Sequence, residues 1–227
     1  MRQAYKGLYL PTLPIGFALL VSKRIRSPRH VISRRYFLAA LGSIALVRPG
    51  HAAAAAAQSP PMSLLSQALG ALERHSHFSP ERDVVGVVDF SAPSAAPRFH
   101  IVDLLGGTSK PVLVAHGRGS DPEHSGWVHS FSNSSGSNAS SAGAYLTEGI
   151  YEGRHGSSRH LRGLEQSNSN AAQRGLVIHS ADYVSYGLAG AAGKIGRSEG
   201  CLAVAGIDLA TVLGRLGPRR LIFVRKC

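Results

Sequence analysis

The sequence predicts a mostly β domain that is built on a sheet and has a few short helices. After position 83 the chain contains a series of short β-rich runs, and clusters of Pro, Gly, Ser or Asp bound most of them. The 227 residues suffice for one such domain and a targeting segment, but not for two comfortable catalytic domains. The predicted strands are Val84–Phe90, Arg98–Leu104, Pro111–Ala115, Ala144–Thr147, Leu176–His179 and Leu221–Val224.

The basic charge of the chain is concentrated in its first 57 residues. They hold nine of the 25 basic residues and no acidic one, which leaves 16 basic residues against 13 acidic ones in the rest of the chain. The rest has no Arg-rich stripe with interleaved aromatic residues, the pattern that favours nucleic-acid binding. We therefore expect no nucleic-acid partner.

The pair Arg34-Arg35 is followed by an apolar run from Phe37 to Val47, and Ala52–Ala57 offers small residues for cleavage. This pattern predicts a twin-arginine (Tat) signal peptide over residues 1–57, with a long n-region. The Tat translocon is then an expected partner, and the mature protein is expected in the periplasm or otherwise outside the cytoplasm. A membrane anchor is the alternative, but a run of 11 apolar residues is well short of the roughly 20 that span a bilayer, so no stable anchor is expected.

Residues 58–83 are predicted to be a linker that carries one amphipathic helix, ahead of a catalytic domain over residues 84–227. From Met62 to His75, apolar residues recur at helical spacing, so this helix is expected to pack on the domain. A second short helix is predicted over Gly206–Leu216. The apolar positions of the first helix are Leu64, Leu65, Ala68, Leu69 and Leu72.

The segment Ser130–Ser141 is rich in Ser and Asn and lies inside the predicted domain. A long polar loop in that place is more often functional than a spacer. Trp127, the only tryptophan, lies just before it. Core packing is the default interpretation of Trp127, and a platform that faces a sugar or a peptide is the alternative.

The segment Gly196–Cys201 places a cysteine in a loop bounded by glycines, and the apolar run Leu176–His179 upstream ends in a histidine. A thiol with a pKa of about 8.5 is only a few per cent thiolate at neutral pH, and a nearby imidazole or a cation such as Arg197 would raise that fraction. Gly200 permits a positive φ and a close approach of backbone N–H groups to a reacting carbonyl. The pattern indicates a cysteine nucleophile with a histidine base.

These residues resemble the YkuD-type L,D-transpeptidases, and most closely the murein L,D-transpeptidase catalytic domain family. Those proteins carry a His about twenty residues before a Ser-x-Gly-Cys loop, as His179 precedes the segment Ser198–Cys201 here. The resemblance extends from about Val84 to Val224. The segments that carry it are His116–Ser120, Phe131–Asn133, Gly163–Glu165, Val177–His179 and Gly196–Ser198.

The resemblance implies a YkuD-like mixed β-sheet domain, sandwich-like, with a few short helices. It implies that Cys201 is the nucleophile, that His179 is the base, and that the backbone carbonyl of Ser180 orients the imidazole. It also places Gly200 and Ser198 among the substrate-binding residues, with backbone N–H groups near Gly200 and Cys201 holding the oxyanion.

Two positions depart from the pattern of the larger family, which usually has His before the Gly-Cys pair and Arg two residues after the Cys. This chain has Glu199 and Ala203 there. The position that would bind a substrate carboxylate is therefore changed, and Arg197 is the candidate substitute.

His116 lies in a glycine-bounded loop after an apolar run and is a candidate substrate-binding residue that faces the same cleft. An exposed histidine in a turn is the alternative. No metal site is expected, because the histidines form no ligand spacing with the cysteine, and no cofactor is predicted. The serines of Ser130–Ser141 lie in no Gly-x-Ser-x-Gly elbow, so a serine hydrolase built on them is not expected.

The chain has two cysteines, and a disulfide between Cys201 and Cys227 is the alternative to a free thiol. Cys227 is the last residue of the sequence, and chain ends tend to fray. Cys201 lies in a motif that needs a free thiol. The sequence therefore predicts a reduced, reactive Cys201.

The resemblance implies a cysteine-dependent L,D-transpeptidase that acts on the peptide stems of peptidoglycan through a thioester acyl-enzyme. With water as acceptor, the same chemistry gives L,D-carboxypeptidase or endopeptidase activity on those stems. A non-catalytic cell-wall-binding homologue is the alternative from another class. The departures at Glu199 and Ala203 allow it, whereas the intact Cys201 and His179 favour catalysis.

Overall fold

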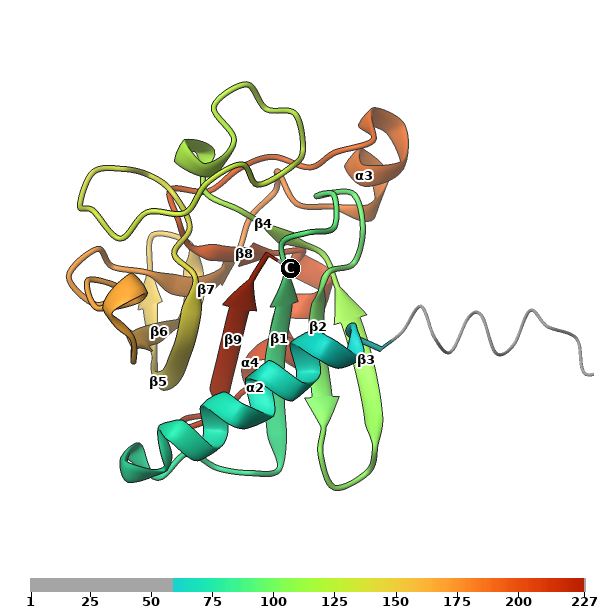
Figure 1. Ribbon diagram of the computed structural model, residues 1–227. Coiled ribbons are helices and arrows are strands. Elements are labelled where there is room, and N and C mark those ends of the chain that lie inside the picture. The colour runs from blue at the N-terminus through green and yellow to red at the C-terminus, as the bar shows by residue number, and fades with distance from the viewer. Residues whose placement is uncertain (1–58, 227) are drawn as a thin grey trace, which may run out of the picture. The chain divides into compact units, whose positions relative to one another are not determined.

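The computed structural model describes residues 59–226 (Figure 1). The predicted signal peptide and Cys227 lie outside the described residues. Helix α2 (Met62–Arg74) is the helix predicted from Met62 to His75, and α4 (Gly206–Arg215) is the second predicted helix. Helix α3 (Tyr186–Ala192) and three short 3-10 helices complete the helical elements of this part of the chain: η1 (Ser76–Phe78), η2 (Arg118–Ser120) and η3 (Gln166–Asn168).

One mixed sheet of nine strands organises the described residues, in the order β3-β2-β1-β9-β5-β6-β7-β8-β4. The pairs β1–β9 and β7–β8 are parallel and the other pairs antiparallel. The strands are β1 (Val84–Asp89), β2 (Phe99–Asp103), β3 (Thr108–Val112), β4 (Val114–Ala115), β5 (Gly143–Gly153), β6 (Gly156–Gly163), β7 (Val177–Ser180), β8 (Leu202–Val204) and β9 (Leu221–Arg225).

The two edge strands of this sheet are consecutive in the chain, since only Leu113 separates β3 from β4. The sheet therefore curves until its edges approach one another and is nearly closed. The predicted mostly β, mixed-sheet fold is confirmed. Closure also explains one error in the predicted elements, because the single strand expected over Pro111–Ala115 is two strands that pair with opposite ends of the sheet.

Helix α2 lies across β1 and β9 on one face of the sheet (Figure 1). Alternate residues of a strand point to opposite faces, so Val85 and Val87 of β1 pack under α2 while Val84 and Val88 face the other side. Burial of a leucine such as Leu64 or Leu72 contributes roughly 2 kcal/mol. The helix is thus part of the same packed unit as the sheet.

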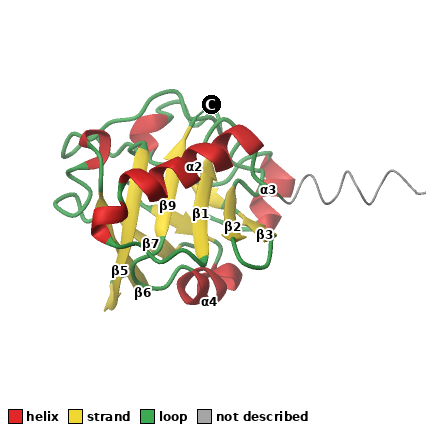
Figure 2. Cartoon of the chain, turned by 60° about the horizontal axis from the view of Figure 1, so that its bottom comes forward, coloured by secondary structure: helices red, strands yellow, loops and turns green. Residues whose placement is uncertain are grey.

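The main hydrophobic core lies on the opposite face of the sheet, where α4 packs (Figure 2). Residues from β1, β2, β7, β8 and β9 meet Val212, Leu213 and Leu216 there. This core holds β7 and β8 as rigid neighbours. It thereby fixes the positions from which the histidine and the cysteine loop project.

Two strands and one helix of the structure escaped the sequence prediction. Strand β6 has a mostly polar sequence, although it lies inside the sheet. Its buried Arg159 donates from Nη1 to the carbonyl of Glu148 at 2.6 Å and from Nη2 to the carbonyl of Leu213 at 3.0 Å. Strand β8 has only three residues, and α3 is rich in Gly and Ala without an apolar stripe.

The segment Ser130–Ser141 forms an ordered loop without strands or α-helices. Asn133 donates from Nδ2 to the carbonyl of Gln166 at 2.9 Å, and Ser132 N–H donates to the carbonyl of Ser140 at 3.0 Å. Trp127, just before it, is 46% exposed, so the default interpretation of core packing is wrong. Between residues 59 and 226, no helix combines the length and the apolar character that a membrane span requires.

Candidate active site

Strands β7 and β8 bring the predicted base and nucleophile to the same place. They pair in parallel with His179 opposite Ala203, and Cys201 directly precedes β8. Both side chains line one cleft of about 750 Å³. The lining residues are Arg118, Ser135, Gly136, Asn138, Tyr151, Arg154, His155, Gln173, Arg174, Gly175, Val177, His179, Tyr183, Arg197, Ser198, Glu199 and Cys201.

His179 is buried and is oriented by its neighbour. Its Nδ1 donates to the backbone carbonyl of Ser180 at 2.8 Å, the contact that the family resemblance implied, and this bond leaves Nε2 as the basic nitrogen of the neutral ring. Burial lowers the pKa of His179, the bond to Ser180 opposes that effect, and the charges of His155 and Arg154 lower it further. The imidazole is therefore neutral at pH 7 and able to accept a proton.

Cys201 is partly buried, with its Sγ 3.8 Å from the carbonyl oxygen of Gly175. Burial raises the pKa of the Cys201 thiol; the N–H of Val177 and the charge of Arg174 lower it, and the charge of Glu199 raises it. The thiol is therefore mostly protonated at neutral pH and needs a base to become nucleophilic. Cys201 forms no disulfide with another described residue.

Ser198 and Gly200 shape the cysteine loop from within. Gly200 has φ +115° and is the donor, through its N–H, to Ser198 Oγ at 3.1 Å. The Ser198 hydroxyl in turn donates to the carbonyl of Cys201 at 2.8 Å. Gly200 is not among the cleft-lining residues, whereas Ser198 is largely buried but does line the cleft. Both residues have a structural role in the loop, and contact of Ser198 with a substrate stays a prediction.

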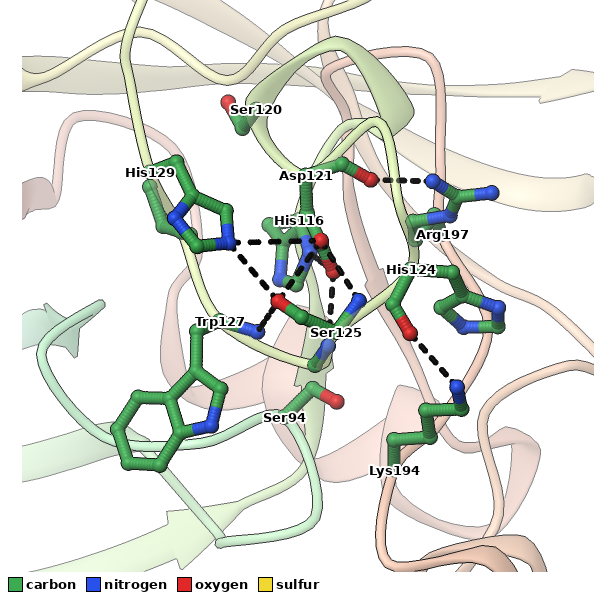
Figure 3. Close-up of polar contacts among 12 residues, drawn as sticks. Ser94, His116, Ser120, Asp121, His124, Ser125, Trp127, His129, Lys194 and Arg197 are labelled. Carbon is green, nitrogen blue, oxygen red and sulfur yellow. Dashed lines mark hydrogen bonds and ion pairs between the residues drawn. The ribbon is translucent and has the colours of Figure 1, made fainter.

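His116 lies beneath this loop and does not line the cleft. It is fully buried, and its Nδ1 accepts from Arg98 Nη2 at 2.7 Å. Its Nε2 lies 3.2 Å from Asp121 Oδ2, and Figure 3 shows these two residues. Both sequence-based interpretations of His116, in the cleft or exposed in a turn, are therefore wrong. Its backbone carbonyl accepts from Ser198 N–H at 2.9 Å, which ties the buried cluster to the cysteine loop.

Charge balance explains the buried cluster of Arg98, His116 and Asp121. Burial and the charge of Arg98 lower the pKa of His116 to about 4, so the ring is neutral and bridges a cation and an anion. Burial raises the pKa of Asp121, but the N–H groups of Ser125 and Gly126 outweigh it and bring the value to about 2. Burial lowers the pKa of Arg98 to about 9, which leaves it charged at neutral pH.

Arg197, the candidate substitute for the carboxylate-binding arginine of the larger family, lines the cleft. It is also bound to the main chain of the segment that follows His116. Its Nη1 donates to the carbonyl oxygens of Asp121 and, at 3.0 Å, Pro122 (Figure 3). The two family departures also have local explanations. Glu199 pairs with Arg118 at 3.0 Å, and Ala203 is buried in an apolar cluster, where it cannot contact a substrate.

The hairpin β5–β6 contributes residues to the cleft that sequence reasoning missed. The ring of His155 lies against that of His179, with the centroids 4.4 Å apart, and Tyr151 and Arg154 line the same wall. The glycines that flank Arg154-His155 mark a turn in the sequence. Only the long hairpin, however, places that turn over the cleft.

Arg174 is a further cleft residue without a sequence prediction. Its Nη1 donates to the carbonyl of Ser132 at 2.8 Å and to Ser141 Oγ at 2.7 Å, so it fastens the Ser-rich loop beside Cys201. No group of three or more His, Cys, Asp or Glu residues among positions 59–226 is arranged to hold a metal ion.

The fold and the cleft define a mixed-sheet domain that presents a thiol and an oriented imidazole to one polar groove. A model of the L,D-transpeptidase catalytic domain matches residues 57–224. The chain belongs to this family.

Solved structures of L,D-transpeptidases are distantly similar. The enzyme from Mycobacterium smegmatis is 13% identical, with a TM-score of 0.40 over 63% of this chain and 58% of that one. L,D-transpeptidase 3 from Mycobacterium tuberculosis is 14% identical, with a TM-score of 0.41 over 63% of this chain and 61% of that one. This chain thus spans about three fifths of their lengths. Curated protein sequences gave no match.

Proposed function

We propose that this protein is a cysteine-dependent peptidoglycan L,D-transpeptidase that acts through a thioester acyl-enzyme on cell-wall stem peptides. The observation that carries the proposal is that Cys201 and the Ser180-oriented His179 line one cleft in a member of the L,D-transpeptidase catalytic domain family. The catalytic residues are Cys201 as nucleophile and His179 as base, with the Ser180 carbonyl positioning the base.

The opposing pKa shifts favour one order of events. Because burial raises the pKa of Cys201 and lowers that of His179, the resting pair is a neutral thiol and a neutral imidazole. His179 Nε2 takes the thiol proton as the sulfur attacks the carbonyl carbon of the diamino-acid residue. The C–N bond to the D-residue then breaks, the proton passes to the departing amine, and a thioester remains. An acceptor amine resolves the thioester and forms the cross-link.

The oxyanion of each tetrahedral intermediate requires backbone donors close to the sulfur. The N–H of Gly200 already donates to Ser198 Oγ. We therefore assign the N–H of Cys201 as the main-chain donor for the oxyanion. This assignment narrows the expectation from two neighbouring N–H groups to one.

Product analysis distinguishes this function from its alternatives. Mature protein is incubated with a stem tetrapeptide and with an amine acceptor, and the products are measured by mass spectrometry. We expect cross-linked or acceptor-exchanged peptide. Trimmed peptide alone would assign the protein as an L,D-carboxypeptidase or endopeptidase. Unchanged peptide with measurable binding would support the non-catalytic cell-wall-binding alternative.

We also propose that the protein works outside the cytoplasm after Tat export, since its substrate is in the cell wall and its first 57 residues carry the paired-arginine pattern. Peptidoglycan stem peptides and, during export, the Tat translocon are its proposed partners.

A further inference from the structure

Four arginines line the cleft that contains Cys201 and His179, and Glu199 is the one acidic residue among the described residues of its wall. A concave site with this charge favours substrates that carry carboxylates. The arginines are Arg118, Arg154, Arg174 and Arg197. The position that supplies an arginine in the larger family is Ala203 in this chain, and Ala203 is buried.

Three of these four guanidinium groups are held by the protein itself. Arg118 pairs with Glu199 at 3.0 Å. Arg174 is fastened to the Ser-rich loop through its bonds to Ser132 and Ser141. Arg197 is fastened through Nη1 to two main-chain carbonyls of the segment after His116.

Arg154 differs from the other three. It is exposed, and it makes no hydrogen bond or ion pair with a residue in the described part of the chain. The register Gly153↔Gly156 makes Arg154 and His155 the two residues of a tight turn between β5 and β6. The ring contact of His155 with His179 fixes this turn against the proposed base.

The position of this turn agrees with the geometry of the leaving group. In the proposed reaction, the protonated His179 gives its proton to the amine nitrogen of the departing D-residue. The carboxylate of that residue is joined to the same nitrogen through one carbon, so it must lie within a few ångström of the imidazole. Arg154 lines the same cleft as His179, and in line with this its charge lowers the pKa of His179.

We propose that Arg154 binds the terminal carboxylate of the departing D-residue, and that the tilted ring contact of His155 with His179 positions the turn for this interaction. The proposal rests on the proposed function for the identity of the substrate. It assigns carboxylate recognition to the tip of the β5–β6 hairpin, in place of Arg197.

The test compares a stem tetrapeptide that has a free terminal carboxylate with the same peptide as its terminal carboxamide. For the unmodified protein we expect kcat/KM to favour the carboxylate roughly tenfold, the effect of one charge-assisted contact in a partly exposed site. Arg154→Gln should bring the ratio of the two values close to one. Arg154→Lys, which keeps the charge, should retain part of the preference.

Two arginine variants are matched controls. Arg197→Gln should lower kcat/KM for both peptides alike, because it loosens the cysteine loop without removing the carboxylate ligand. Arg162→Gln, on β6 but outside the cleft, should leave the ratio unchanged. If Arg154→Gln keeps the preference, or Arg197→Gln removes it, the assignment to Arg154 is wrong.

Binding measurements separate this inference from the proposed function. Calorimetry on Cys201→Ala should show roughly tenfold tighter binding of the carboxylate peptide, and Cys201→Ala with Arg154→Gln should not. Selective binding without any turnover in the unmodified protein would reject the transpeptidase and keep the Arg154 site. Turnover with no carboxylate preference would support the transpeptidase function and reject the Arg154 site. If neither peptide binds, both proposals are contradicted.

Discussion

Among single residues, His179 and Cys201 must act as one unit if the proposed catalysis is correct. Their positions on the parallel strands β7 and β8 give them a common cleft, and their pKa values are shifted in directions that keep both neutral at rest. Cys201 packs only against the outside of the main hydrophobic core, and His179 is a buried polar residue beside the cleft.

Substitution of either member should therefore remove turnover without unfolding the protein. We expect Cys201→Ala and His179→Ala each to lower kcat below detection, and the double variant to be little worse than either single one, since residues that share a step are strongly non-additive. Steady-state kinetics and circular dichroism check this. Near-normal turnover in His179→Ala would mean that another group is the base, and buried His116 could not serve.

His116 gives the protein a predictable dependence of stability on pH. Its pKa is about 4 in the folded protein against an ordinary value of 6.5, so between these values the unfolded chain binds a proton that the folded chain does not. The free energy of unfolding should fall as the pH drops from 6.5 towards 4, by up to about 3 kcal/mol from this group alone.

Denaturant unfolding of the unmodified protein and of His116→Gln, each at pH 7 and pH 4.5, isolates this contribution. At pH 7 the variant should be less stable by about 1–3 kcal/mol, because Arg98 and Asp121 lose a buried partner. At pH 4.5 the difference should shrink, since Gln takes up no proton in either state. A difference that is constant or grows on acidification would contradict the buried neutral bridge.

Some residues of the site could be predicted from the sequence, and others could not. Motif spacing and the family resemblance indicated that Cys201 and His179 lie in one cleft and that the Ser180 carbonyl contacts the imidazole, while their catalytic roles stay predictions. These signals were insufficient for His116 and Arg197, because burial of the first and the internal bonds of the second depend on Arg98 and Asp121, which lie far from the cysteine in sequence. Arg154 escaped because the β5–β6 hairpin, and not a sequence motif, brings it to the cleft.

At the scale of elements, the loop before β8 illustrates how backbone conformation serves the site. Gly200 has φ +115°, and an added Cβ would lie 2.7 Å from the carbonyl oxygen of Ala139. The loop can keep its internal bonds only if this position has no side chain.

Gly200→Ala should therefore lower both stability and acylation. We expect the free energy of unfolding to fall by roughly 1–3 kcal/mol, and the rate of acyl-enzyme formation by at least about tenfold. Gly214→Ala is a suitable control, because Gly214 lies in α4 with open space around its Cβ position and should gain up to about 1 kcal/mol. Equal stability of the two variants would show that the loop tolerates a side chain.

The helices and strands that were predicted correctly are those whose apolar residues form a clear pattern in the sequence. β1, β2, β7 and β9 consist mostly of buried apolar residues, and α2 and α4 have one apolar face each. Prediction failed for β6, whose polar residues are paired within the sheet by hydrogen bonds to both neighbours, and for β8, which is too short to show a period. These two segments form strands because their backbones pair with neighbouring strands, and their side-chain pattern gives no sign of it.

At the scale of the whole molecule, the near closure of the sheet explains why one cleft collects residues from distant parts of the sequence. The segment after β4 pairs with the cysteine loop through the bridge Gly117↔Ser198, while the β5–β6 hairpin reaches the same place from the other side. The charge of this assembly is modest, because most of the net charge of +12 comes from the first 57 residues.

The paired arginines of the first segment make export testable. Replacing both Arg34 and Arg35 by Lys should leave unprocessed precursor in the cytoplasm, because the twin-arginine pair is the signal that the translocon reads. Immunoblots of cell fractions measure precursor and mature protein. Unchanged export and processing in cells that lack the Tat translocon would exclude this route, without affecting the assignment of the catalytic residues.

The proposed acyl-enzyme is the most direct test of the central claim. The mature protein is mixed with a stem tetrapeptide, quenched in acid within milliseconds to seconds, and examined by intact mass and peptide mapping. We predict a mass increase equal to the mass of the stem minus that of the released D-amino acid, located on Cys201, absent in Cys201→Ala and much slower to form in His179→Ala. An adduct on another residue, or equal adduct formation in Cys201→Ala, would contradict the account.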